Sequence, residues 1–302
     1  MNNPPLGKLS LFTQDWWWDA VCPPEKRHEI EFRDEHGALR GIWRMAKVRR
    51  LGIFDIYTMP PLTQHSGLFL ANRKAFIKLL AQIPHRQSLC LNIGFGLNDN
   101  EIHFAREQGI RVSKKVTHRL ENLSDLTKVY QGLKPARQRQ IRKAERHLTA
   151  MQIDDIEPLI RLQAETFKRR GLKNPYPPQT VRRLYAAVKE HQAGCLIALK
   201  DNEHQIMACG LFVHDDKVCY SLTHGFHKLG QDVGAGSLLQ WKGIEYASQN
   251  GLIFDFEGSN IESIANFNLS FGATTETYAC LERYDTFFLF GERLWNRIKS
   301  IL

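Results

Sequence analysis

The chain has 302 residues, of which 43% are hydrophobic and 24% charged, and its formal net charge at pH 7 is +9. This is the composition of a soluble globular protein, and the length suits two domains of ordinary size. The sequence has no run of about 18 apolar residues, so it predicts no membrane-spanning helix. Residues 1–5 show no basic region followed by an apolar stretch, so we expect no secretion signal.

Cysteine usage and charge narrow the classes of function. Six cysteines stand at positions 22, 90, 195, 209, 219 and 280, without a C-x-x-C pair or a metal-ligand spacing. Most lie in apolar runs, so we expect buried free thiols, no metal and a cytoplasmic location. The basic charge favours an anionic partner: CoA, a phosphorylated lipid, a membrane surface or tRNA.

The first half opens with a tryptophan-rich segment. Residues 9–21 contain three adjacent tryptophans, Trp16, Trp17 and Trp18, on an expected short helix capped by Thr13 or Ser10. Three consecutive side chains cannot face one way on a helix, so we expect at least one to be partly exposed. Packing within a domain is favoured over a membrane-interface belt, because large aromatic side chains dominate buried surface.

Strands come first in the chain, and helices and strands then alternate. Hydrophobic periodicity predicts strands at 29–32, 39–47, 53–58, 88–93 and 110–117, with helices at 72–82 and 99–108. This order predicts an α/β arrangement around a mixed sheet.

Residues 121–147 form a polar and basic connector. A helix-like linker over 121–132 leads into a helix at 135–147 that has proline in its first turn. One stripe of this second helix is apolar. The other stripe is basic and consists of Arg139, Arg142, Lys143 and Arg146. It is interpreted either as a solvated face or as a track for an anion such as a tRNA backbone or a lipid pyrophosphate.

The second half contains a glycine turn between a strand and a helix. Before it, the pattern predicts helices at 154–170 and 180–191 and strands at 195–200, 205–213 and 217–226; after it, a helix at 237–249 and a strand at 252–257. In the turn, Gly234 and Gly236 lack Cβ and let the backbone approach a ligand closely. Free N–H groups at a helix N-terminus favour an anion, so the turn predicts a pyrophosphate cradle.

Two motifs resemble a known family. Gln231-x-x-Gly234-x-Gly236 resembles the Q/R-x-x-G-x-G/A signature of the GNAT acyltransferase superfamily. The run 254–259, followed by Phe267 and Phe271-Gly272, resembles the Fem-like and BioF2-like branch, which includes the peptidoglycan aminoacyltransferases. Similar tryptophan-rich openings and stretches like 59–63 occur in that branch.

The resemblance implies a fold of two tandem GNAT-like mixed-sheet domains with flanking helices, the first without the glycine turn. We therefore expect an N-terminal lobe over 1–118, a basic helical connector over 119–150 and an acyltransferase lobe over 151–302. Gly94-Phe95-Gly96 in the first lobe is then a strand-to-helix corner and not a cofactor turn.

The resemblance also implies a cofactor site for acyl-CoA, with acetyl-CoA as the expected donor. Strand 217–226 would hold the pantetheine and the acyl carbonyl. The pyrophosphate would be bound by Gln231, Val233, Gly234, Ala235, Gly236 and Ser237.

Acyl transfer to an amine needs a group that accepts the amine proton. Strand alternation puts Asp255 and Glu257 on one face beside the expected cleft, where either carboxylate would serve as base if burial raised its pKa. The alternative is that they cap a helix or pair with an arginine. His224 and His227 are further candidates, and Tyr176 contacts either the substrate or only its own loop.

One position departs from the common GNAT pattern. A tyrosine that serves as acid for the thiolate usually lies four residues before the Phe-Gly-like turn, and here that position is Asn268. We assign Asn268 to the cofactor site and leave the general acid open.

We therefore hypothesise an N-acyltransferase that uses acyl-CoA and a small-molecule or lipid-linked amine acceptor. The alternatives are an aminoacyl-tRNA-dependent transferase acting on a peptidoglycan precursor, and a non-catalytic binding protein of the same fold. The apolar stripe of residues 287–302 is expected to pack on the N-terminal lobe; peripheral membrane contact is its other interpretation.

Overall fold

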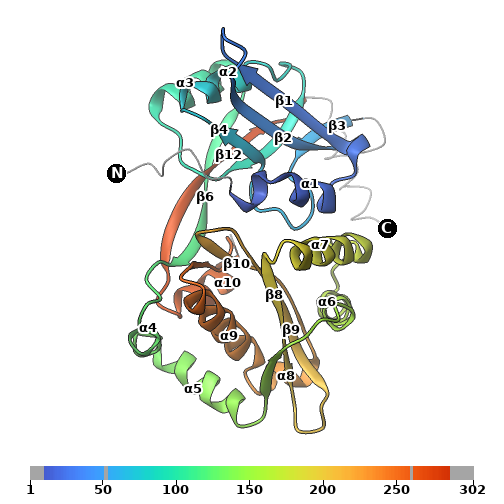
Figure 1. Ribbon diagram of the computed structural model, residues 1–302, viewed down its shortest axis with the longest axis vertical. Helices are drawn as coiled ribbons and strands as arrows, with labels where there is room; N and C mark the ends of the chain where they lie inside the picture. Colours follow the sequence, from blue (N-terminus) through green and yellow to red (C-terminus); the bar gives the residue numbers. More distant parts are fainter. Residues whose placement is uncertain (1–9, 51–53, 259–260, 286–302) are drawn as a thin grey trace, which may run out of the picture. The chain divides into compact units, whose positions relative to one another are not determined.

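The structure is a computed structural model that describes residues 10–50, 54–258 and 261–285 (Figure 1). The chain divides into two compact units: Met1–Lys115 with Thr277–Leu302, and Val116–Glu276. Strands β6 (Arg111–Leu120) and β12 (Thr274–Arg283) each begin in one unit and end in the other. The expected lobes (1–118 and 151–302) and connector (119–150) have other boundaries than these units and stay a prediction.

The first unit is built on a mixed sheet with the strand order β1-β2-β3-β5-β12 and with β4 paired to β2. Its elements are α1 (Asp15–Val21), β1 (Arg27–Arg33), β2 (Leu39–Arg50), β3 (Phe54–Thr58), β4 (Gly67–Leu70), α2 (Lys74–Leu80), β5 (Ser88–Ile93) and α3 (Asp99–Glu107), with short 3₁₀ turns at Leu11–Thr13 and Pro24–Lys26. Strands β3 and β5 are parallel, and the other described pairs are antiparallel.

The tryptophan-rich segment packs inside the first unit. Trp17 and Trp18 are fully buried, and their indole nitrogens donate to Thr63 and to the backbone oxygen of Phe12. Trp16 is half-buried, which confirms that one of the three tryptophans is partly exposed. The expected cap was wrong: α1 begins after Gln14, and no side chain caps it.

The second unit contains a sheet with the strand order β6-β11-β10-β9-β8-β7. Its strands are β7 (Thr149–Gln152), β8 (Gly194–Lys200), β9 (Ile206–His214), β10 (Val218–Phe226) and β11 (Ile253–Asp255). Its helices are α4 (Leu126–Gly132), α5 (Pro135–Glu145), α6 (Glu157–Arg169), α7 (Pro178–Glu190), α8 (Lys228–Asp232), α9 (Ala235–Gln249) and α10 (Glu262–Leu269). Strands β10 and β11 are parallel, and the remaining neighbours are antiparallel.

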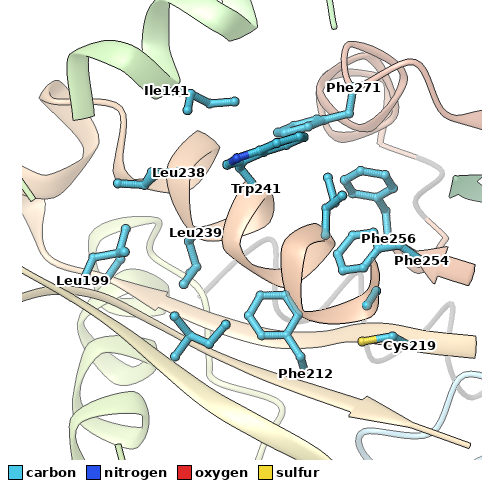
Figure 2. Packing of buried hydrophobic residues seen from close by; sticks show 14 of the residues in the cluster. Ile141, Leu199, Phe212, Cys219, Leu238, Leu239, Trp241, Phe254, Phe256 and Phe271 are labelled. Carbon is cyan, nitrogen blue, oxygen red and sulfur yellow. The ribbon is translucent and has the colours of Figure 1, made fainter. Parts of the chain in front are cut away.

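Helix α9 lies at the centre of the second unit and is buried on two sides. Toward the sheet, Leu239 packs with Phe212, and on the opposite side Trp241 packs between Ile141 of α5 and Phe271 (Figure 2). Helices α6 and α7 cover the other face of the sheet (Figure 1). Burial on both sides explains why this helix is apolar around most of its circumference.

The predicted α/β architecture around a mixed sheet is confirmed. The sequence interpretation did not include the short strands β4 and β7 or the long strand β12, and it extended β11 two residues too far. The apolar stripe predicted over 287–302 lies outside the described residues. No helix in the part of the chain that the structure describes is long and apolar enough to cross a membrane.

Candidate active site

Strands β10 and β11 separate after a short stretch of pairing. They are paired only from Val218–Ile253 to Tyr220–Asp255, where β11 ends, while β10 continues to Phe226. A bulge interrupts β10 between Ser221 and Thr223. Backbone groups along this half of β10 therefore have no strand partner on the β11 side among the described residues. Unpaired N–H and C=O groups on a strand edge can bind an extended ligand chain.

Glu257 lies two residues beyond the end of β11. Its backbone has a left-handed conformation (φ +60°), and its N–H donates to Oδ1 of Asp255 over 2.7 Å. Its Oε1 atom is buried and has no hydrogen-bond partner among the described residues. Burial, and to a smaller extent the charge of Asp255, raises the pKa of the Glu257 carboxyl well above its usual value. A buried carboxyl group with a raised pKa, beside a strand edge, is a candidate for proton transfer.

Tyr176 comes from the loop between α6 and α7. Burial raises the pKa of its phenol, and the negative charge of Glu257 raises it further. The loop is ordered by a hydrogen bond from the N–H of Tyr176 to the side chain of Asn174 and by edge-on contact with Phe167. The structure thus brings the Tyr176 phenol within electrostatic reach of Glu257.

Asp255 is held differently from Glu257. It is fully buried and accepts hydrogen bonds from the Thr117 hydroxyl, from Nε of Arg119 at 2.7 Å and from the N–H of Glu257. The sequence offered three roles for Asp255: base, helix cap or partner of an arginine. The structure shows the last of these, with Arg119 as the partner. Asp255 fixes the end of β11 and the backbone that carries Glu257.

His224 lies on the face of β10 that packs against α9. Its Nε2 atom is 2.8 Å from Oγ of Ser221 and 3.3 Å from Nε2 of Gln240. Ser221 also donates to Oε1 of Gln240, which closes the network. Burial lowers the pKa of His224 to about 4, so its imidazole is neutral near pH 7. His227, the other histidine considered, precedes α8 and has a buried Nδ1.

The glycine turn at the start of α9 is packed against α5. Gly234 has φ +86°, and a Cβ atom there would lie 2.8 Å from the carbonyl oxygen of Gln140. The side chain of Arg137 donates to the hydroxyls of Ser237 and Ser270, and so connects the start of α9 with the end of α10. Its guanidinium also lies 4.1 Å from the centre of the Phe267 ring.

These contacts bear on whether the turn suits the pyrophosphate of CoA. The N–H groups of Ala235 and Gly236 have no hydrogen-bond partner in the described part of the chain, and Arg137 adds positive charge, as an anion requires. However, the Ser237 hydroxyl is already bonded to Arg137 and Gln140, and Gly234 lies against α5. On the side that α5 covers, Gly234 and the Ser237 hydroxyl are therefore engaged by other residues of the protein and not by an anion.

The remaining residues assigned to the cofactor lie near this turn. Gln231 is exposed and Val233 half-buried; Val233 lines a cavity of about 250 Å³ together with Leu148 of the segment before β7 and Met207 of β9. Asn268 is buried on α10. Their role toward a cofactor stays a prediction. The sequence interpretation missed the packing role of Arg137, because the predicted basic stripe did not include this residue. The one feature of the sequence that pointed to it was its position two residues after the start of α5.

The comparisons with known proteins agree on the class of domain. Residues 135–262 match the family described as an acetyltransferase (GNAT) domain. This stretch runs from the first residue of α5 into α10, and it includes the separating strands, the glycine turn and Glu257. The part of the chain that is similar to a GNAT domain thus lies within the second unit.

The chain as a whole has a Fem-like GNAT fold. FemX matches with a TM-score of 0.66 and 11% identity over 92% of this chain and 96% of that chain. L-PGS from Bacillus licheniformis matches with a TM-score of 0.56 and 11% identity over 98% and 99% of the two chains. A tandem GNAT protein from the clavulanic acid biosynthesis pathway matches with a TM-score of 0.51 and 12% identity over 88% and 85%. No curated protein sequence matches the chain.

Proposed function

We propose that the chain is an N-acyltransferase that moves an acyl group from an activated ester or thioester to an amine, with Glu257 accepting the amine proton. The observation that carries this proposal is the buried Oε1 of Glu257, which has no partner among the described residues and lies just beyond the end of β11. Beside it, β10 continues without β11 and presents backbone groups along its edge.

The chemistry follows from these two features. The amine nitrogen attacks the acyl carbonyl, and the proton it must lose passes to the Glu257 carboxylate, whose raised pKa makes it a better proton acceptor than an exposed carboxylate. Collapse of the tetrahedral intermediate then breaks the C–O or C–S bond to the donor, and the released alcohol or thiol takes up the proton. In this proposal, N–H groups on the free edge of β10 stabilise the oxyanion of the tetrahedral intermediate. Asp255 has a structural role in this proposal: it is bonded to Arg119 and Thr117 and holds the Glu257 backbone.

The donor favoured by the geometry is the aminoacyl ester of tRNA. Helix α5 covers the side of the turn where Gly234 and Ser237 lie, so the turn is poorly open to CoA. The outward side of the same helix exposes Arg139, Arg142 and Arg146, none of which has an ion-pair partner among the described residues. An exposed cationic helix suits the phosphates of a nucleic acid, and the Fem-like resemblance implies such donors. The acceptor class is then a small or lipid-linked amine, such as that of a peptidoglycan precursor.

The experiment offers both kinds of donor to the same protein. Purified chain is incubated with an amine acceptor pool and with acetyl-CoA, longer acyl-CoAs or a mixture of aminoacylated tRNAs, and the acceptors are analysed by mass spectrometry. We expect an aminoacylated acceptor in the tRNA arm, and loss of that product in Glu257→Gln. An acylated product only in the CoA arms would refute the donor but keep the transferase. A folded protein without product in any arm would refute the proposed function.

A charge-reversal series tests the tRNA contact by itself. The triple variant Arg139→Glu, Arg142→Glu and Arg146→Glu is compared with Lys74→Glu, Lys78→Glu and Arg106→Glu, which reverses three exposed charges on α2 and α3. Only the first variant should lose tRNA binding, and each lost phosphate contact should reduce the salt dependence of binding by roughly one unit of slope. Equal losses of tRNA affinity in both variants would show that binding depends only on the net charge of the protein and not on α5.

A further inference from the structure

Two cysteines and a glutamate lie on one face of the sheet in the first unit. In the register of β5 and β12, Cys90 is opposite Glu282 and Asn92 is opposite Cys280. Side chains two residues apart on a strand share a face, so Cys90, Cys280 and Glu282 form a triangle across the two strands. Their two sulfur atoms and a carboxylate oxygen all lie within 4.8 Å of one another.

The glutamate of this triangle is held from strand β6. Arg111 donates to Oε2 of Glu282 over 2.7 Å, and the Ser113 hydroxyl donates to the same oxygen over 3.3 Å. The hydrogen bonds to described residues therefore converge on Oε2 and leave Oε1 for another partner. Such fixing of one oxygen is how outer-shell groups orient a metal-ligating carboxylate.

We propose that Cys90, Cys280 and Glu282 bind a zinc ion. Two thiolates and a carboxylate are ligands that Zn²⁺ accepts in a tetrahedral site, and thiolates select it against Mg²⁺ and Ca²⁺. Cys280 is buried and Cys90 is half-buried, and the fourth ligand of the proposed site is water. The three ligands carry three negative charges, and Zn²⁺ carries two positive ones. The remaining negative charge is compensated by Arg111, which pairs with Glu282, and by Lys115, whose charge acts on both thiols.

This site has no signature in the sequence. Its cysteines, Cys90 and Cys280, are 190 positions apart in the sequence, and the antiparallel pairing of β5 with β12 brings them together. The sequence therefore led us to expect free thiols and no metal. The inference is independent of the acyl transfer proposed for the second unit, because all of its ligands belong to the first unit.

Cobalt titration tests the proposal with a direct readout. The full chain is stripped with a chelator, kept reduced with a phosphine, and titrated with Co²⁺, whose charge-transfer absorption reports thiolate ligation. We expect one Co²⁺ per chain, displaced by one Zn²⁺. Cys90→Ser and Cys280→Ser should abolish the thiolate signal, and Glu282→Gln should weaken binding at least tenfold. Arg111→Gln should weaken it by roughly 10- to 100-fold, as outer-shell substitutions do.

The control is Cys22→Ser, which removes a buried thiol of the same unit that lies outside the triangle. It should bind Co²⁺ as the wild type does. If the cysteine variants fail to fold, as judged by circular dichroism, Glu282→Gln and Arg111→Gln decide the question because both residues reach the sheet surface. Absence of a thiolate signal in the reduced wild type would overturn the proposal, and so would equal binding by wild type, Glu282→Gln and Arg111→Gln.

Discussion

The N–H of Glu257 donates to Oδ1 of Asp255 over 2.7 Å, so the two acids at the end of β11 are joined through the backbone of one and the side chain of the other. Asp255 also binds Arg119 and Thr117, whereas Oε1 of Glu257 has no partner among the described residues. The two carboxyl groups have the same chemistry but different surroundings. We therefore propose proton transfer for Glu257 and a structural role for Asp255.

We expect Glu257→Gln to lower the turnover number by roughly 100- to 10,000-fold, the usual contribution of a positioned general base. The amide keeps the size of the side chain but cannot take a proton at neutral pH. Turnover is measured with whichever donor gives product in the donor comparison, and folding is verified by circular dichroism. Glu262→Gln, at an exposed position at the start of α10, is the matched control and should keep wild-type turnover. A Glu257→Gln enzyme that keeps full turnover would exclude this residue as the base.

The raised pKa of Glu257 also predicts how stability changes with pH. Because burial raises this pKa, the folded chain binds the proton more tightly than the unfolded chain does. The resulting stabilisation is complete below the ordinary glutamate pKa of about 4.3 and is lost as the pH rises toward the raised value. Glu257→Gln cannot ionise and removes this contribution to the slope. The urea midpoint of the wild type should fall more between pH 5 and pH 8 than that of the variant; parallel curves would contradict the assignment.

The sequence predicted those parts of the candidate site that depend on residues close together in the chain. The turn at Gly234 and the helix after it follow from residues that are neighbours in the chain, and α9 begins at the turn as expected. Asp255 and Glu257 were selected because they follow a short apolar strand. The sequence could not choose between them, because the difference comes from Arg119 and Thr117, which precede them by more than a hundred residues.

Long-range packing explains what the sequence did not predict. Helical periodicity placed Ile141 on the buried stripe of α5, and it is fully buried. Periodicity names a buried face but not the element that covers it, so the contact between Gln140 and Gly234 could not be foreseen. Strand β12 was missed for a related reason: its first residues are polar and exposed, which gives a weak strand pattern.

Asp255→Asn should destabilise the fold. Asp255 is fully buried and pairs with Arg119, and removing one member of a buried pair leaves the other charge uncompensated. We expect a loss of about 3 kcal/mol in the free energy of unfolding, at the low end of values for such pairs because Arg119 is partly exposed. Urea denaturation at pH 7 measures it. Asp232→Asn, at an exposed position, should change stability by less than about 0.5 kcal/mol. Equal stabilities of the two variants would show that the pair with Arg119 contributes nothing.

The closeness of α5 to the glycine turn can be tested by comparing the stabilities of alanine variants of two glycines, one at each end of α9. Gly234 precedes the helix and Gly251 follows it, and both have left-handed backbones, with φ +86° and +66°. An alanine at either position pays about 1–2 kcal/mol for that conformation. A Cβ at Gly251 meets nothing within 4 Å, whereas one at Gly234 lies 2.8 Å from the carbonyl oxygen of Gln140.

Gly234→Ala should therefore cost about 1–3 kcal/mol more than Gly251→Ala, the range observed for overpacking of a close contact. The difference is read from urea denaturation curves of the two variants at the same pH, and it cancels the backbone strain that both share. Equal losses would mean that α5 stands away from the turn in solution. In that case Arg137 would also leave Ser237, the N–H groups before Ser237 would open to a pyrophosphate, and acyl-CoA would become the better donor for the same transferase.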